Sequence, residues 1–303
     1  MGSHSLDGAV VLVTGATSGI GEATARGLAE RGATVLLHGR DRRKGERVVD
    51  RLAAETGADD LALYTADFAD LDAVRSLADA VLADYDRLDV LVNNAGTWQE
   101  KRRLTDDGIE YTFAVNHFAP FLLTALLRGR LAASGTVASD ASPPDGPSRV
   151  VTVSSGLHSR ATMDFDAIRG PDGPAGIDAY ATSKLANVLF TSELARRLPK
   201  TVTANCLHPG VVPSTALARA GSGLSRLVWK AMGVVGSLVP FGPVDSAAEA
   251  ARTSIYLASS PDVADVTGEY FVDCQPRRSS AESRDRETQR RLWEVSEALV
   301  GLE

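Results

Sequence analysis

Three side chains in this sequence are placed where they could move a proton. Tyr180 and Lys184 stand four residues apart in a stretch expected to be helical, so a phenol and an ammonium share one face. A phenol has a pKa of about 10, and a neighbouring ammonium stabilises the phenolate and lowers that pKa. Ser155, at the end of an expected strand, supplies a hydroxyl that could orient a carbonyl; Ser154 is the alternative if the register differs by one. These groups predict acid–base chemistry at a substrate oxygen.

A glycine-rich turn near the N-terminus could hold a phosphate. Thr14-Gly15 follows an apolar run, and Gly19-Ile20-Gly21 comes after three further residues. Glycines let backbone N–H groups approach a pyrophosphate, and the helix that follows directs its positive end to the same place. The spacing differs from the common Gly-x-Gly-x-x-Gly fingerprint. Taken alone, the turn could be only a connection between a strand and a helix.

The elements that must position these groups alternate along the chain. Short apolar runs at 9–13, 34–37, 61–64, 90–92, 150–153 and 202–207 predict strands. Helices are expected at 19–31, 42–55, 71–85, most of 109–130, and 178–198. This alternation predicts an α/β fold, a doubly wound Rossmann-type parallel sheet with helices on both faces and a ligand crevice at the strand ends.

Composition narrows the class of protein. The net charge of −7 over 303 residues disfavours a nucleic-acid partner, because such a partner needs a basic surface. Two cysteines indicate no disulfide framework, and no apolar run is long enough to span a membrane, so a cytoplasmic protein is expected. The five histidines have no metal-ligand spacing and are interpreted as structural or incidental, so no metal site is predicted.

Three segments lie outside this alternation. Residues 132–148 and 157–177 are rich in turn formers and are expected to be loops. Residues 211–243 contain an apolar stretch, interpreted as a lid over a substrate pocket; a packed surface helix or an oligomer contact is the alternative. Because no linker separates two cores, residues 1–303 are expected to form one domain.

Several motifs together resemble a known family. Thr-Gly-x-x-x-Gly-Ile-Gly, Asn93-Asn94-Ala95-Gly96 after the fourth strand, and Tyr180-x-x-x-Lys184 are similar to the motifs of short-chain dehydrogenases/reductases, over residues 8–297. The 25-residue gap from Ser155 to Tyr180, and the sequence after Tyr180, resemble the retinol-dehydrogenase-like branch. The resemblance implies a single-domain oxidoreductase that interconverts alcohols and carbonyls with a nicotinamide cofactor.

The resemblance also assigns roles to residues. It implies that Tyr180 exchanges the proton, Ser155 orients the substrate oxygen, Lys184 tunes Tyr180 and holds the ribose, and Asn116 supports a water in a proton relay. The cofactor-binding residues that it implies are Gly15, Thr17, Ser18, Gly19, Ile20, Gly21, Arg40, Asp67, Phe68, Asn94, Ala95, Gly96, Tyr180, Lys184, Pro209, Gly210, Val212 and Thr215. For Asp67, the acid expected at the adenine, an ordinary helix N-cap is the alternative.

The end of the second strand bears on the choice of cofactor. An acid at this place suits the ribose hydroxyl of NAD, whereas an arginine suits the 2′-phosphate of NADP. Gly39 takes the place of the acid and Arg40 follows it, which predicts NADP(H). A register one residue different would bring Asp41 to the ribose and favour NAD(H), which stays possible.

The resulting hypothesis is an NADP(H)-dependent oxidoreductase acting on a hydrophobic or mid-sized alcohol, ketone or aldehyde. Trp98 is a candidate for lining the pocket. The alternatives are a reductase of an activated double bond on the same fold and a non-catalytic NADP(H)-binding sensor or scaffold. The resemblance also makes a homodimer or homotetramer possible, through the helices around residues 109–130.

Overall fold

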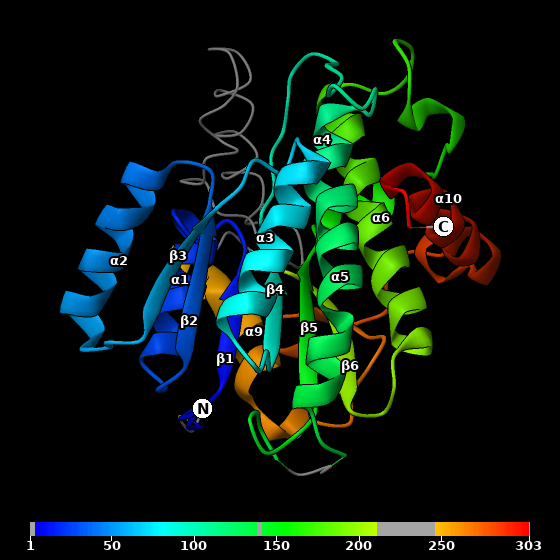
Figure 1. Cartoon of the computed structure of the whole chain (residues 1–303). Helices are drawn as coiled ribbons and strands as arrows, with labels where there is room; N and C mark the ends of the chain where they lie inside the picture. The colour runs from blue at the N-terminus through cyan, green and yellow to red at the C-terminus, as the bar shows by residue number, and fades with distance from the viewer. Residues whose placement is uncertain (1–3, 138–140, 211–245, 303) are drawn as a thin grey trace.

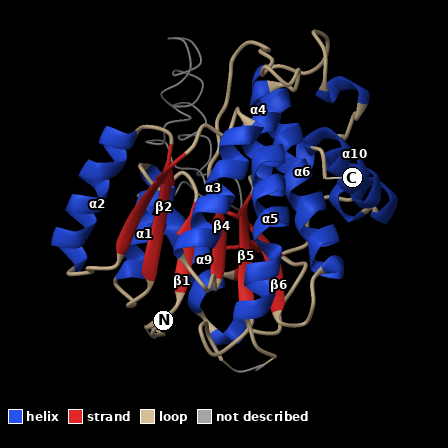
Figure 2. Ribbon diagram, in the orientation of Figure 1, coloured by secondary structure: helices blue, strands red, loops and turns tan. Residues whose placement is uncertain are grey.

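A mainly parallel sheet forms the centre of the molecule (Figure 2). The structure is a computed structural model that describes residues 4–137, 141–210 and 246–302. Within these residues the strand order is β3-β2-β1-β4-β5-β6-β7-β8, and only β7 and β8 pair antiparallel. The strands are β1 Val10–Val13, β2 Thr34–Gly39, β3 Leu61–Thr65, β4 Val90–Asn93, β5 Ser148–Val153, β6 Val202–His208, β7 Tyr270–Val272 and β8 Gln275–Pro276. The predicted doubly wound sheet is confirmed.

Helices cover both faces of the sheet (Figure 1). The α-helices are α1 Gly19–Ala29, α2 Arg42–Thr56, α3 Leu71–Asp84, α4 Tyr111–Phe113, α5 Ala119–Ser134, α6 Gly176–Arg197, α9 Ala247–Ser259 and α10 Arg286–Val300. Apolar residues of α1, α2 and α9 form one buried cluster with the sheet, and those of α3, α5, α6 and α10 form another. The predicted helices and strands are present, with ends that differ by a few residues.

Local signals explain several of these boundaries. Asp41 caps the start of α2, and Gly57 ends it in the left-handed conformation with φ of 70°. Asp70, rather than Asp67, is the N-cap of α3. The alternative interpretation of Asp67 as the helix cap is therefore wrong; its carboxylate accepts the Ala69 N–H at 3.0 Å in the turn before α3.

The segment expected to be mostly helical at 109–130 is interrupted. It consists of α4, a π-helical turn (η1) at Ala114–Phe118, and α5. Pro120 explains part of the irregularity, because proline has no N–H to donate to the carbonyl four residues earlier, which belongs to Asn116. The interruption thus falls at a residue that the sequence had marked as functional.

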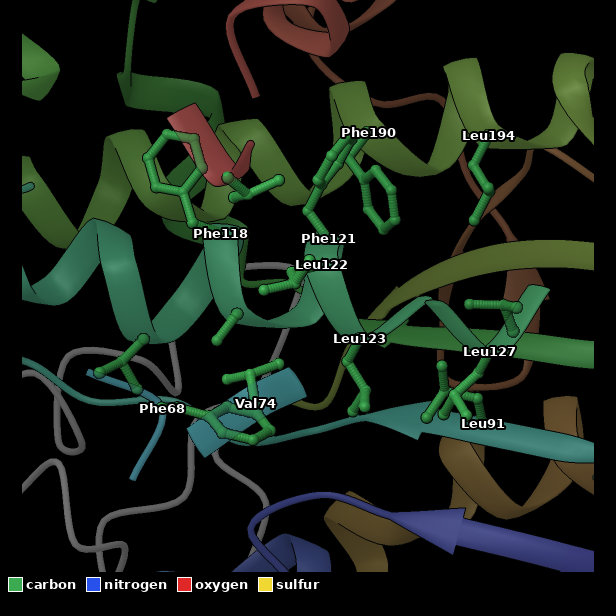
Figure 3. Close-up of a cluster of buried hydrophobic side chains, with 14 of the residues drawn as sticks. Phe68, Val74, Leu91, Phe118, Phe121, Leu122, Leu123, Leu127, Phe190 and Leu194 are labelled. Carbon is green, nitrogen blue, oxygen red and sulfur yellow. The ribbon is translucent and has the colours of Figure 1, made fainter. Parts of the chain in front are cut away.

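The larger cluster fills the space between the sheet and its helices on one face (Figure 3). Figure 3 shows Leu122, Leu123 and Leu127 of α5 among side chains from neighbouring elements, including Val74 of α3 and Leu91 of β4. These residues are fully buried. Burying a leucine side chain contributes about 1.5–3 kcal/mol, so this cluster holds α5 and α6 rigidly against the strands that carry the site.

The C-terminal helix α10 packs on α6 and on the start of α5. Trp293 lies 5.0 Å from Phe121 and 6.0 Å from Phe190, measured between ring centres. The His117 ring bonds Ser296 of α10 through Nε2 at 2.9 Å. The helices around residues 109–130, through which an oligomer was predicted to form, are therefore partly covered by α10 of the same chain. The oligomeric state stays a prediction.

The structure describes most of the two segments expected to be loops and does not describe the expected lid. Residues 157–177 contain two 3₁₀ turns, Gly156–Arg160 and Asp166–Ile168, and end in the first turn of α6. The Arg102 guanidinium holds this loop by donating to the carbonyls of residues 167, 170 and 174. In the other loop, α5 extends to Ser134 and β5 begins at Ser148. The expected lid at 211–243, with Val212 and Thr215, lies outside the described residues.

Two further features can be stated for the described part of the chain. No helix there is both long enough and apolar enough to cross a membrane. Cys206 and Cys274 are buried and free, in accord with the expected absence of a disulfide between them.

Candidate active site

The candidate site is a cleft at the carboxyl ends of the parallel strands. The predicted residues that line it are Gly15, Thr17, Ser18, Gly19, Ile20, Gly21, Arg40, Asp67, Phe68, Asn94, Ala95, Gly96, Tyr180, Lys184 and Pro209. Gly210 follows directly with φ of 83°. Sequence reasoning missed other lining residues, among them His38, Ala66 and Tyr111. The position agrees with the rule that open α/β sheets bind ligands beyond their strand ends.

The glycine-rich turn is closely packed against the start of the next loop. Gly15 has φ of 64°, and a Cβ there would lie 2.8 Å from Cα of Ala95. A Cβ on Gly21 would collide with the Gly15 carbonyl. Ser18, the N-cap of α1, makes no capping hydrogen bond with its side chain. The first N–H groups of α1 therefore face the cleft without a side-chain cap, which fits a bound pyrophosphate.

Thr14 joins this turn to the Asn-Asn-Ala-Gly segment. Its Oγ1 accepts hydrogen bonds from the backbone N–H groups of Asn94 and Ala95, both at 3.0 Å, and donates to the Val92 carbonyl at 3.2 Å. Asn94 Nδ2 donates back to the Thr14 carbonyl at 2.7 Å. The threonine is fully buried, so its hydroxyl fixes two loops of the cleft relative to each other.

Replacing Thr14 by Val tests this link, because valine keeps the shape and removes the hydroxyl. The Ala95 N–H then loses its acceptor and the Asn94 N–H keeps only the Val92 carbonyl, so we expect the free energy of unfolding to fall by about 1–3 kcal/mol. Urea denaturation measures the change. Thr14→Ser, which keeps the hydroxyl, is the matched control and should lose less. Equal stability of the valine and serine variants would contradict the role of the hydroxyl.

His38 braces the opposite wall of the cleft. Its Nδ1 accepts the Gly15 N–H at 3.4 Å, and its Nε2 lies 3.1 Å from the Ala66 carbonyl, to which it donates. The ring stacks on Phe68 with 4.2 Å between ring centres. Burial lowers the pKa of His38 to about 4, so the imidazole is neutral and can accept from Gly15. This histidine, interpreted from the sequence as structural or incidental, is structural, and it lines the cleft.

The end of β2 places Arg40 at the cleft. Its guanidinium donates to the Tyr111 hydroxyl at 3.2 Å. The Asp41 carboxylate instead accepts the Lys44 N–H at 3.0 Å and caps α2. A Cβ on Gly39, at the place of the ribose-binding acid, would collide with the Thr17 side chain, so an acid there would require Thr17 to move.

Two serines follow β5 and do different things. The Ser154 hydroxyl is buried and donates to the Lys184 carbonyl at 2.8 Å, so it fastens α6 to the sheet. The Ser155 hydroxyl accepts the Leu157 N–H at 3.3 Å. The Ser155 side chain also acts on Tyr180, because it lowers the pKa of the phenol. Of the two serines, Ser155 is the one that meets Tyr180.

Burial dominates the electrostatics of Tyr180 and Lys184. It raises the pKa of Tyr180 to about 12, which outweighs the opposing hydrogen bond from Ser155. It lowers the pKa of Lys184 to about 8. The Lys184 ammonium lies 5.7 Å from the centre of the Tyr180 ring and donates to the Val153 carbonyl at 2.9 Å. The net lowering of the phenol pKa expected from the neighbouring lysine is absent from this structure, because desolvation of the phenolate is larger.

Asn116 is buried behind Lys184. Its side-chain oxygen accepts the Thr97 N–H at 2.7 Å, and its amide nitrogen donates to the Thr97 carbonyl and to the Ser183 hydroxyl. A Cβ on Gly96 would lie 3.5 Å both from that oxygen and from the Lys184 nitrogen. Asn116 and Lys184 therefore converge at Gly96.

This fold and cleft define a class, the Rossmann-type α/β proteins with a dinucleotide site and a Tyr–Lys pair. Residues 9–157 match the family model for short chain dehydrogenase. Human Retinol dehydrogenase 14 is 39% identical over 98% of this chain and 88% of its own length. A solved structure of an uncharacterised protein from Mycobacterium paratuberculosis has TM-score 0.74 and 32% identity, covering 98% of this chain and 95% of its own. The Pseudomonas aeruginosa RhlG/NADP active-site complex has TM-score 0.67 and 28% identity, covering 89% and 97%.

The chain therefore belongs to the short-chain dehydrogenase/reductase family, in its retinol-dehydrogenase-like branch. It is an NAD(P)-dependent oxidoreductase of the class that acts on CH–OH and C=O groups.

Proposed function

We propose that the protein interconverts an alcohol and a ketone or aldehyde with NADP(H), with Tyr180 as the acid–base group. One observation carries this proposal: a single cleft joins Arg40 and the glycine-rich turn at one end to Tyr180 and Lys184 at the other. A dinucleotide needs its phosphates and its nicotinamide held at once, and this cleft offers groups for both. A hydrophobic or mid-sized substrate is the proposed partner, and the alcohol named in Retinol dehydrogenase 14 supports it.

Three features support NADP(H) over NAD(H). The place of the ribose-binding acid holds Gly39, packed closely against Thr17, and the Asp41 carboxylate is used as a helix cap. Arg40 and Lys44 line the cleft where a 2′-phosphate would lie. The related RhlG structure is a complex with NADP.

The mechanism assigns each side chain a step. When bound, the cofactor supplies or accepts a hydride at C4 of its nicotinamide. Tyr180, protonated at neutral pH, gives its proton to the carbonyl oxygen during reduction. The Ser155 hydroxyl, which acts on the pKa of Tyr180, donates to the same oxygen and holds it in place. Lys184 stabilises the phenolate that is left and holds the ribose.

Asn116 serves the proton relay through its main chain. Its side chain already makes hydrogen bonds to Thr97 and Ser183. Pro120 cannot donate to the Asn116 carbonyl, and in this proposal that oxygen holds the water of the relay. The relay would return a proton to Tyr180 after each reduction.

A spectrophotometric screen tests the proposal. NADPH consumption is followed with ketones, aldehydes and enones of increasing apolar size, retinal included. Turnover of ketones or aldehydes supports the proposed reaction, and turnover of enones alone would indicate a double-bond reductase. Tight NADPH binding without turnover of any of them would favour a sensor or scaffold.

The pH dependence should differ between the two directions. Oxidation needs the Tyr180 phenolate, which is scarce below its pKa of about 12, so kcat/KM for an alcohol should rise about ten-fold per unit from about pH 6 to about pH 8. Reduction needs the neutral phenol, which predominates over the same range, so its rate should stay nearly flat. Steady-state rates with an alcohol and its ketone measure both. An oxidation rate that does not change with pH would contradict the role of Tyr180 as the base.

A further inference from the structure

A buried histidine holds the turn that carries Ser155. This 3₁₀ turn, Gly156–Arg160, begins directly after Ser155, and His158 lies in its middle. The Ser155 carbonyl accepts two hydrogen bonds from the same residue: one from the His158 backbone N–H at 3.1 Å and one from its ring Nδ1 at 2.7 Å. The His158 ring is buried, with 4% of its surface exposed. It therefore fixes the main chain of Ser155 directly.

The two ring nitrogens of His158 have partners of opposite kind. A carbonyl oxygen can only accept, so Nδ1 carries the proton. Nε2 accepts the backbone N–H of Ser280 at 3.3 Å, so it carries none. Both contacts together require the neutral Nδ1–H tautomer. Burial also lowers the pKa of His158, which favours the neutral ring.

The C-terminal segment 279–284 anchors this ring from outside the sheet. Ser280 is 125 positions from Ser155 in the sequence, so the contact joins two distant parts of the chain. The same segment contacts the loop again five residues after His158, where the Glu282 carboxylate accepts the Met163 N–H at 3.1 Å. Tyr270 of β7 covers the His158 ring at 4.9 Å between ring centres.

The other side of the turn is closed as well. A Cβ on Gly156 would lie 3.3 Å from Nε2 of His208, so the backbone after Ser155 fits closely against that ring. The Ser155 hydroxyl accepts the Leu157 N–H within the turn and lowers the pKa of Tyr180, so the turn sets where this hydroxyl lies relative to the phenol. The direction of the catalytic hydroxyl thus depends on how firmly the turn is held.

We propose that His158 is a positioning residue for Ser155: its Nδ1–H bond to the Ser155 carbonyl, anchored by Ser280, aims the serine hydroxyl at the substrate oxygen. This inference rests on the reaction proposed above. His158 touches neither the cofactor cleft nor Tyr180 in the described contacts and acts only through Ser155.

Two substitutions separate the nitrogens of the ring. In His158→Asn the amide nitrogen takes the place of Nδ1 and can still donate to Ser155. In His158→Gln the polar end takes the place of Nε2, and the donor to Ser155 is lost. A small misplacement of a catalytic group can cost up to about 100-fold, so we expect kcat for carbonyl reduction to fall about ten-fold in the Gln variant and less than about three-fold in the Asn variant. The KM and Kd for NADPH should not change in either.

The outcome distinguishes positioning from a general loss of structure. Equal losses of kcat in both variants, in proportion to their melting temperatures, would overturn the proposal, as would a loss confined to the KM for NADPH. Absence of turnover in the unmodified protein would instead contradict the proposed function. The ¹⁵N resonances of the His158 ring at neutral pH give a readout independent of turnover. A proton on Nδ1 alone supports the proposal, and a proton on Nε2 contradicts it.

Discussion

Tyr180→Phe is expected to lower kcat/KM for carbonyl reduction by about 1,000-fold while NADPH affinity changes less than about three-fold, because a general acid contributes roughly 100- to 10,000-fold. Phenylalanine keeps the buried ring and removes only the hydroxyl that meets Ser155. The glycine-rich turn, Arg40 and Lys184, which hold the cofactor in this proposal, are untouched. The measurement pairs NADPH consumption with a fluorescence titration of NADPH binding.

A second tyrosine supplies the matched control for this substitution. Tyr256 of α9 lies on the opposite face of the sheet, against Phe271, and does not line the cleft. Tyr256→Phe removes a hydroxyl of the same kind and should keep nearly full activity. A Tyr180→Phe variant with more than about a tenth of the original activity would fall below the smallest effect expected of a general acid, and the assignment would have to be withdrawn.

The sequence predicted the sheet well because its strands are buried on both faces. Runs such as Val10–Val13 and Val90–Asn93 are apolar at almost every position. This pattern is typical of a parallel strand that helices cover on both faces. The residues of the cleft were predicted from the same logic, since motifs that follow parallel strands must meet at one edge. Fifteen of the predicted cofactor residues line one cleft for that reason.

What the sequence did not reveal depends on contacts between distant residues. Thr14 stands inside the glycine motif, yet its acceptors and donors lie some 80 positions away. The hydrogen bond from Gly15 to His38 and the one from Ser280 to His158 also join residues that are far apart in the sequence. A single histidine carries no periodicity, so its tautomer and partners follow only from the folded arrangement. The interruption at Ala114–Phe118 had one readable signal, Pro120.

A large loss of activity in Tyr180→Phe would identify Tyr180 as the general acid. The choice between NADP(H) and NAD(H) depends instead on Arg40, at the other end of the cleft. Arg40 is exposed, and its guanidinium is held at the cleft by the Tyr111 hydroxyl. A 2′-phosphate would receive charge-assisted, forked hydrogen bonds from such a group, which an uncharged ribose hydroxyl would not. Selectivity for NADP(H) should therefore depend on this one side chain more than on Arg42, which donates to Thr65 instead.

Arg40→Asp is expected to change the ratio of kcat/KM for NADPH over NADH by about 1,000-fold toward NADH, because the forked bonds are lost and like charges are brought together. Most of the change should appear as weaker NADPH binding, measured by nicotinamide fluorescence at fixed ionic strength. Arg43→Asp, at an exposed position that does not line the cleft, is the control of equal charge change. If both variants lose NADPH affinity equally, the general field of this basic helix start, rather than Arg40, selects the phosphate. If the unmodified protein prefers NADH, the presence of Arg40 at the end of β2 does not determine the choice of cofactor.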